Sequence, residues 1–163
     1  MAKWLDVAKL LVGTHEAAGS ADNPLIIEWA KKFGGWTASF YQHDEIPWCG
    51  LFTAHCLQEA GVAPPKDFLA AKSFATWGDE MDHGIPGAIL VFGRVGGGHV
   101  GFYVSEDDDA YHVLGGNQSD SVCLSRIAKT RCLSIRWPSG ESKPWFSGPV
   151  VCEFNAVLSK NEA

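Results

Sequence analysis

The first half of the chain repeats apolar side chains at the spacing of amphipathic helices, with polar residues between them. This pattern predicts helices over residues 4–12, 24–33 and 49–60 and a short one within 68–77. Glycines at 13, 34 and 61 stand where the three longer helices should end. Asn23 followed by Pro24 provides an N-cap and a proline in the first turn of the second helix.

The second half changes to the short apolar runs of β-strands. Strands are predicted over residues 88–92, 99–104, 111–114, 121–124, 133–137 and 150–154. Helices followed by strands predict an α+β fold, in which a C-terminal antiparallel sheet packs on the N-terminal helices. The length of 163 residues fits one domain, which we place at residues 1–158, with 159–163 as a frayed tail.

Composition narrows the classes of partner and compartment. A net charge of −6 argues against nucleic acid as the main partner, because phosphate binding requires a basic face. The apolar runs fall short of the ~20 residues that a membrane span needs, so no membrane insertion is expected. The N-terminus lacks the apolar core of a signal peptide, which predicts a protein synthesised in the cytoplasm and exported only by another machine. We expect a monomer.

The five cysteines are expected as reduced thiols in a chain without a secretion signal. Three of them lie in strand-like segments, namely Cys123, Cys132 and Cys152. A disulfide between two of these three would require an oxidising compartment, and the sequence leaves it open. Cys49, His55 and Cys56 could suggest zinc, but on a helix His55 points away from the other two and no second Cys/His pair completes a tetrahedron. No metal and no cofactor are therefore expected.

Cys49 stands where the third predicted helix begins, two residues after Pro47. The partial positive charge and unpaired N–H groups of a helix start favour thiolate, so we expect the pKa of Cys49 to be lowered by more than about one unit. The same N–H groups could hold an oxyanion, and Gly50 leaves room for a substrate backbone. A lone cysteine here would more simply be a small buried apolar residue. The His99 segment favours a nucleophile instead.

His99 follows three glycines and opens an apolar strand, which makes it the candidate base. A hairpin register that sets Asn117 opposite His99 leaves a short acidic turn and sets His112 opposite Val104. Direct opposition of His112 and His99 leaves no room for a turn. A register shifted by one residue puts His112 on the face of His99 but about four residues along, roughly 13 Å away at ~3.3 Å per residue. Asn117 is therefore the predicted third member, with Gln118 and His112 in reserve. The competing interpretation of Asn117 is a turn residue after two glycines.

A second oxyanion donor should precede the cysteine. Gln42 and Tyr41 carry suitable donors, and Trp48 could form a wall of the cleft. The competing interpretation is that these residues pack on the start of the helix or in the core.

Three segments together resemble a known family. They are Pro47-Trp48-Cys49, Gly98-His99-Val100-Gly101-Phe102 and Leu114-Gly115-Gly116-Asn117-Gln118. This combination resembles the CHAP and NlpC-type papain-like cysteine peptidases and amidases, most closely a phage-associated, endolysin-like branch, over roughly residues 5–138. The chain departs from the family at the third member, because many NlpC-type relatives carry a histidine there and CHAP relatives often carry a glutamate just ahead of an asparagine.

The resemblance implies a papain-like fold and hydrolysis of amide bonds in bacterial peptidoglycan, with Cys49 as nucleophile, His99 as base and Asn117 as third member. Either an N-acetylmuramoyl-L-alanine amidase or a stem-peptide endopeptidase would use these groups. The expected setting is a phage endolysin that reaches the cell wall, in the periplasm, after holin release. Alternatives are an injected antibacterial toxin with an immunity protein as partner, a catalytically inactive module that binds the wall or a partner, and an acyltransferase.

Overall fold

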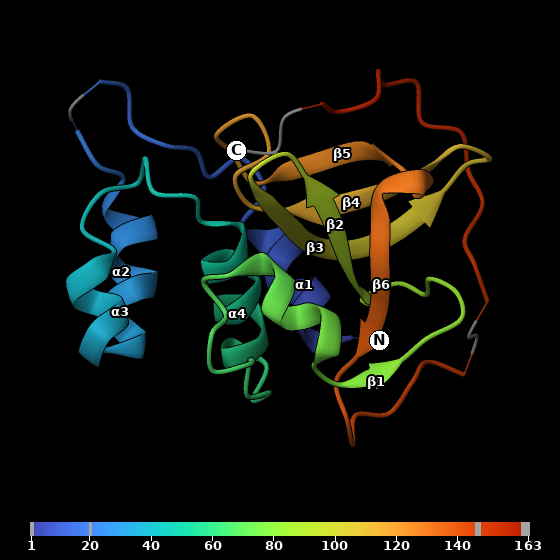
Figure 1. The fold of residues 1–163 in the computed structure, drawn as a ribbon, viewed down its shortest axis with the longest axis horizontal. Helices are drawn as coiled ribbons and strands as arrows, with labels where there is room; N and C mark the ends of the chain where they lie inside the picture. The colour runs from blue at the N-terminus through green and yellow to red at the C-terminus, as the bar shows by residue number, and fades with distance from the viewer. Residues whose placement is uncertain (1, 20, 146–147, 161–163) are drawn as a thin grey trace.

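The computed structural model describes residues 2–19, 21–145 and 148–160, and over these residues the fold is α+β (Figure 1). The helices are α1 (Lys3–Leu10), α2 (Pro24–Phe33), α3 (Gly35–Phe40) and α4 (Cys49–Glu59), with the 3₁₀ helices η1 (Ala71–Thr76) and η2 (Lys129–Arg131). The predicted helices at 4–12, 24–33 and 49–60 are confirmed to within two residues at each end. The short helix expected within 68–77 is η1.

The sequence pattern did not predict α3. Gly34 has a φ of 66° and Gly35 a φ of 51°, so the chain turns at the first glycine and begins a new helix at the second. A pair of glycines was interpreted as a stop, but here it joins two helices.

Within the described residues the strands form one antiparallel sheet of six, in the order β1-β6-β2-β3-β4-β5. Their bounds are β1 Asp79–Glu80, β2 Ile89–Arg94, β3 Gly97–Glu106, β4 Ala110–Gly115, β5 Cys123–Ala128 and β6 Cys132–Trp137. Two predictions need correction. The strand expected at 121–124 starts at Cys123 and continues to Ala128. The strand expected at 150–154 does not form, and only Val151 makes an isolated bridge, to Glu106.

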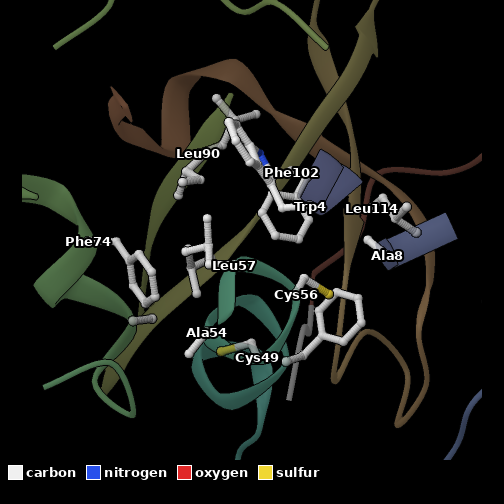
Figure 2. Packing of buried hydrophobic residues seen from close by; sticks show 14 of the residues in the cluster. Trp4, Ala8, Cys49, Ala54, Cys56, Leu57, Phe74, Leu90, Phe102 and Leu114 are labelled. Atoms are coloured by element: carbon white, nitrogen blue, oxygen red, sulfur yellow. The ribbon is translucent and has the colours of Figure 1, made fainter. Parts of the chain in front are cut away.

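Helix α4 lies against the sheet at the centre of the core. All its side chains from Cys49 to Leu57 are buried, although the sequence indicated one apolar face. Figure 2 shows Leu57 facing Leu90 and Phe102 of the sheet. In Figure 1, α2 and α3 lie on the side of α4 away from the sheet. The helix is therefore covered on several sides, beginning at its first residue.

The segment after β6 runs around the outside of the sheet (Figure 1). The N–H of Glu106 donates to the Val150 carbonyl at 2.8 Å, and the N–H of Ser159 donates to the Arg126 carbonyl at 2.8 Å. Residue 159, predicted as the start of a frayed tail, is thus bonded to the sheet, and the rest of that prediction from 161 onward lies outside the described residues. In the part of the chain described here, no helix has the length and apolar character to cross a membrane.

Candidate active site

Cys49 is the first residue of α4 and is only 4% exposed. Trp48 is the N-cap residue and contributes no side-chain cap, so helix bonding begins with the Phe52 N–H donating to the Trp48 carbonyl at 2.8 Å. The predicted position of Cys49 at a helix start is confirmed. The backbone N–H of Val100, the residue after His99 on β3, is among the groups that act to lower the pKa of the Cys49 thiol. The helix and the sheet therefore meet at this thiol.

The expected direction of the pKa shift at Cys49 was wrong. Burial raises the pKa of the thiol above its ordinary value. The N–H of Val100, the charge of Arg94 and the N–H groups of Gly50 and Cys49 act in the opposite direction but do not overcome burial. The helix start alone therefore does not bring the pKa of this thiol below its ordinary value.

His99 lies on β3, a central strand, and is fully buried. It pairs with Phe92 of β2, and the two rings stack with centroids 6.4 Å apart. Its Nε2 atom lies 3.0 Å from Oε1 of Gln118. The ring is thus fixed by a stacking partner and by a hydrogen bond.

The Gln118 amide determines which tautomer of His99 is present. Its Nε2 donates to the carbonyls of Val113 at 3.1 Å and Cys123 at 2.5 Å. These two acceptors turn the amide oxygen toward His99, where it must accept a hydrogen bond from the Nε2–H of the ring. In the neutral imidazole the free lone pair is then on Nδ1, so Nδ1 is the atom that can accept a proton. Gln118 is itself fully buried, which holds this arrangement away from water.

Two glycines make this arrangement sterically possible. A Cβ at Gly115 would lie 2.8 Å from Gln118 Oε1 and 3.3 Å from His99 Nε2. A Cβ at Gly116 would lie 2.6 Å from Phe52 and 2.7 Å from the Trp48 ring. The pair lets β4 end directly against the start of α4, which explains the need for Gly-Gly before Asn117.

The hydrogen bond of His99 Nε2 is made with Gln118, one of the reserve candidates, and not with Asn117, the predicted third member. The predicted register is present at first, because Leu114 lies opposite Phe102 and Val113 opposite Tyr103. However, β4 ends at Gly115, and Asn117 takes a left-handed φ of 55°. The extrapolation of alternate faces beyond the strand therefore failed. Asn117 has the backbone of the turn residue in the competing interpretation; it is buried, and its Oδ1 has no hydrogen-bond partner among the described residues.

His112 is not part of this site. A β-bulge between Tyr103 and Ser105 places Ser105, rather than Val104, opposite His112. Ser105 is six residues from His99 along β3, roughly 20 Å at ~3.3 Å per residue. His112 is therefore excluded as an orienter of His99.

The two side chains predicted as second oxyanion donors near Cys49 make other hydrogen bonds. Gln42 is exposed, and its side chain donates to the Ser39 carbonyl at 2.9 Å. The Tyr41 hydroxyl is near Cys49 in the core but donates to the Ile46 carbonyl. Neither side chain supplies a second oxyanion donor as it stands.

Trp48 and Gly50 do not face a substrate. Trp48 is fully buried and donates from Nε1 to Glu16 Oε1 at 2.7 Å. A Cβ at Gly50 would lie 2.1 Å from the carbonyl oxygen of Phe68. The chain's own backbone occupies the space at this glycine. The prediction that Gly50 leaves room for a substrate backbone was therefore wrong.

A cleft of about 230 Å³ opens at Cys49. It is lined by Pro47, Cys49, Leu69, Ala70, Ala71, Lys72, Arg94, Gly97 and Gly98. Its two charged side chains, Lys72 and Arg94, are both cations in a protein of net charge −6. No pattern in the sequence marked Lys72, which lines the cleft from η1. A hollow of about 740 Å³ beside Trp4 and Trp145 is larger, but its described lining has no cysteine or histidine.

The five cysteines are free thiols. No cluster of three or more His, Cys, Asp or Glu side chains suited to a metal is found among the described residues. A scan against models of known protein families gives no match for this chain, and a search of curated proteins finds no similar sequence.

Proposed function

We propose that this protein is a papain-like cysteine peptidase or amidase that hydrolyses amide bonds of bacterial peptidoglycan, and that it acts as a phage endolysin. One observation carries the proposal: Cys49 begins a buried helix that abuts the strand carrying His99, and His99 is oriented by the fixed amide of Gln118. The resemblance of the Cys49, His99 and Gly115–Gln118 segments to peptidoglycan hydrolases supports the substrate.

The chemistry follows from the position of each proton. Nδ1 of His99 takes the thiol proton of Cys49, and the sulfur attacks the carbonyl carbon of a stem-peptide amide. The oxyanion that forms is held by backbone N–H groups at the start of α4. The protonated His99 then gives its proton to the leaving amine, and afterwards accepts one from the water that releases the acyl group. Gln118 keeps Nε2 protonated throughout, because its oxygen can only accept.

The charges of the cleft support an anionic substrate. Lys72 and Arg94 flank the space at Cys49, and the stem peptides of peptidoglycan carry free carboxylates beside their amide bonds. A carboxylate placed between the two cations would position the neighbouring amide over the sulfur. Arg94 also lowers the pKa of Cys49, although it does so less than burial raises it.

The test is lysis of permeabilised Gram-negative cells, measured as the rate at which the turbidity of the suspension falls. We expect Cys49→Ala and His99→Gln each to reduce the rate by a factor of about 10³ or more, with unchanged circular dichroism. Cys152→Ser is the matched control, because it removes an exposed thiol and leaves Cys49 in place. It should lyse cells at the wild-type rate.

Iodoacetamide separates an enzyme from a wall-binding module. Alkylation should stop lysis by the wild type and by Cys152→Ser alike, because both contain Cys49. Lysis that survives stoichiometric alkylation of Cys49 would rule out the thiol mechanism.

A further inference from the structure

A second set of nucleophile, base and acid lies at the far end of β3 from His99. Ser105 Oγ is 2.7 Å from His112 Nδ1, and His112 Nε2 is 2.7 Å from Asp107 Oδ2. The thiol of Cys152, from the segment after β6, donates to Ser105 Oγ at 3.1 Å and lies 3.8 Å from His112 Nδ1. None of these groups takes part in the proposed hydrolysis.

Asp107 is held as a carboxylate. Arg126 donates to it from Nε at 2.7 Å and from Nη2 at 2.9 Å, and the N–H groups of Asp109 and Ala110 donate to it at 3.0 Å each. Arg126, ahead of His112 and the two N–H groups, keeps the pKa of Asp107 well below its usual range. An ionised Asp107 can only accept, so His112 carries its proton on Nε2.

The direction of the remaining hydrogen bonds follows from this tautomer. Nδ1 of His112 accepts from the Ser105 hydroxyl, and Ser105 Oγ accepts from the Cys152 thiol. A proton that leaves Cys152 can therefore pass through Ser105 to His112, where Asp107 faces the imidazolium that forms. His112 and Ser105 are buried, at 0% and 4% exposure, so water does not compete for these bonds.

Cys152 itself is exposed and faces a pocket of about 660 Å³. Arg126, which lines this pocket, is paired with Asp107 in a salt bridge. The other charged side chains of the lining are acidic: Asp108, Asp109 and Glu153. A reagent that enters is therefore favoured when it carries positive charge, and the pocket has room for an adduct on the sulfur.

We propose that Cys152 is a second nucleophilic thiol and the site at which small disulfides modify this protein, with cationic disulfides preferred. The proton of Cys152 moves through Ser105 to His112 as the sulfur attacks one sulfur of the reagent. A new S–S bond forms, the S–S bond of the reagent breaks, and the departing thiolate takes the proton and leaves as a thiol. The reaction is an exchange that consumes one disulfide and needs no other oxidant.

The test measures mixed-disulfide formation at Cys152 by peptide mass spectrometry, with cystamine as the cationic probe and oxidised glutathione as the anionic one. Each rate is compared with that of the same chain unfolded in urea. In the folded protein we expect cystamine to modify Cys152 at least about tenfold faster than in the unfolded chain. The preference for cystamine over oxidised glutathione should also exceed that of the unfolded chain and should fall with added salt.

Two variants test the proton path, and two other thiols serve as internal controls. Ser105→Ala and His112→Gln should each slow the reaction at Cys152 by at least about tenfold. Cys123 and Cys132 donate to backbone carbonyls, and neither is hydrogen-bonded to Ser105 or His112 among the described residues, so their rates should not change. Modification of folded Cys152 no faster than in the unfolded chain would overturn the proposal without any variant. Equal rates in folded Ser105→Ala and the wild type would also overturn it.

Discussion

Gln118 determines the tautomer of the candidate base. Its amide nitrogen is held by two backbone carbonyls, so its oxygen can serve only as acceptor for His99 Nε2. A histidine or a carboxylate in place of Gln118 could also orient the ring, but each is a titratable group. The neutral amide does so without adding charge to a site whose thiol is already disfavoured as an anion by burial.

The first prediction compares two neighbouring side chains. Gln118→Leu should reduce kcat by about tenfold to a hundredfold, because the ring loses the partner that fixes its tautomer. Asn117→Gly keeps the left-handed backbone at φ 55° and should retain kcat within about twofold. Steady-state assays on soluble muropeptides decide this, and a larger loss for Asn117→Gly than for Gln118→Leu would contradict the assignment.

The second prediction concerns the glycine beside these two groups. Gly115→Ala places a methyl 2.8 Å from Gln118 Oε1, so it should lower kcat by about tenfold or more and destabilise the fold by about 1–3 kcal/mol. Gly93→Ala is the matched control on β2, because its methyl meets Leu133 at 3.7 Å, an ordinary contact. Equal activity of the two variants, measured with urea unfolding in parallel, would show that the space at Gly115 is not needed.

At the scale of elements, α4 is the helix that assembles the site. Its start is covered by the Phe68 carbonyl and its body by the sheet and other helices, which is why all residues from Cys49 to Leu57 are buried. This burial on several sides, with the contacts of α4 to β3, places Cys49 beside the strand that carries His99.

The third prediction tests this covering. Alanine is favoured over glycine in a helix by up to about 1 kcal/mol, yet Gly50→Ala should destabilise the protein by about 1–3 kcal/mol. The reason is the 2.1 Å approach of the new Cβ to the Phe68 carbonyl. Gln58→Ala, at an exposed position of the same helix, should change stability by less than about 0.5 kcal/mol in urea titrations. A more stable Gly50→Ala variant would contradict the account.

Helix positions could be predicted from sequence because their apolar spacing and end signals agree, as at Asn23-Pro24 and Cys49. The register of β3 with β4 was also predictable near Phe102, where alternation of faces holds. It failed at both ends, at the bulge beside Ser105 and at the left-handed turn at Asn117. Both failures arise from backbone conformations that side-chain periodicity does not encode. For the same reason His112 was wrongly considered as a group that orients His99.

At the scale of the whole molecule, the two sulfur sites lie at opposite ends of β3. The charged side chains that line the cleft at Cys49 are both cations, whereas those that line the pocket at Cys152 are acidic apart from Arg126, in a molecule of net charge −6. The core also contains a titratable group on the side of α4 that faces α2, His55. Its ring is 5% exposed and stacks on Trp29 with centroids 5.0 Å apart.

The fourth prediction concerns stability and pH. Burial lowers the pKa of His55 to about 4, with Glu59 acting in the opposite direction. Between pH about 6.5 and 4 the unfolded chain binds a proton that folded His55 does not, so the free energy of unfolding should fall by up to about 3 kcal/mol as pH decreases. His55→Phe keeps a ring on Trp29 and should lose this part of the slope. Identical pH profiles of the two proteins in urea titrations would contradict it.

The most direct test of the central claim is mass spectrometry of purified sacculi digested by wild-type protein and by Cys49→Ala. The wild type should release muropeptides in which one amide has become a free amine and a free carboxylate, and Cys49→Ala should release none. The mass of the fragments identifies the amide, which distinguishes an amidase from an endopeptidase. Absence of new fragments with the wild type, or equal release by Cys49→Ala, would contradict the account.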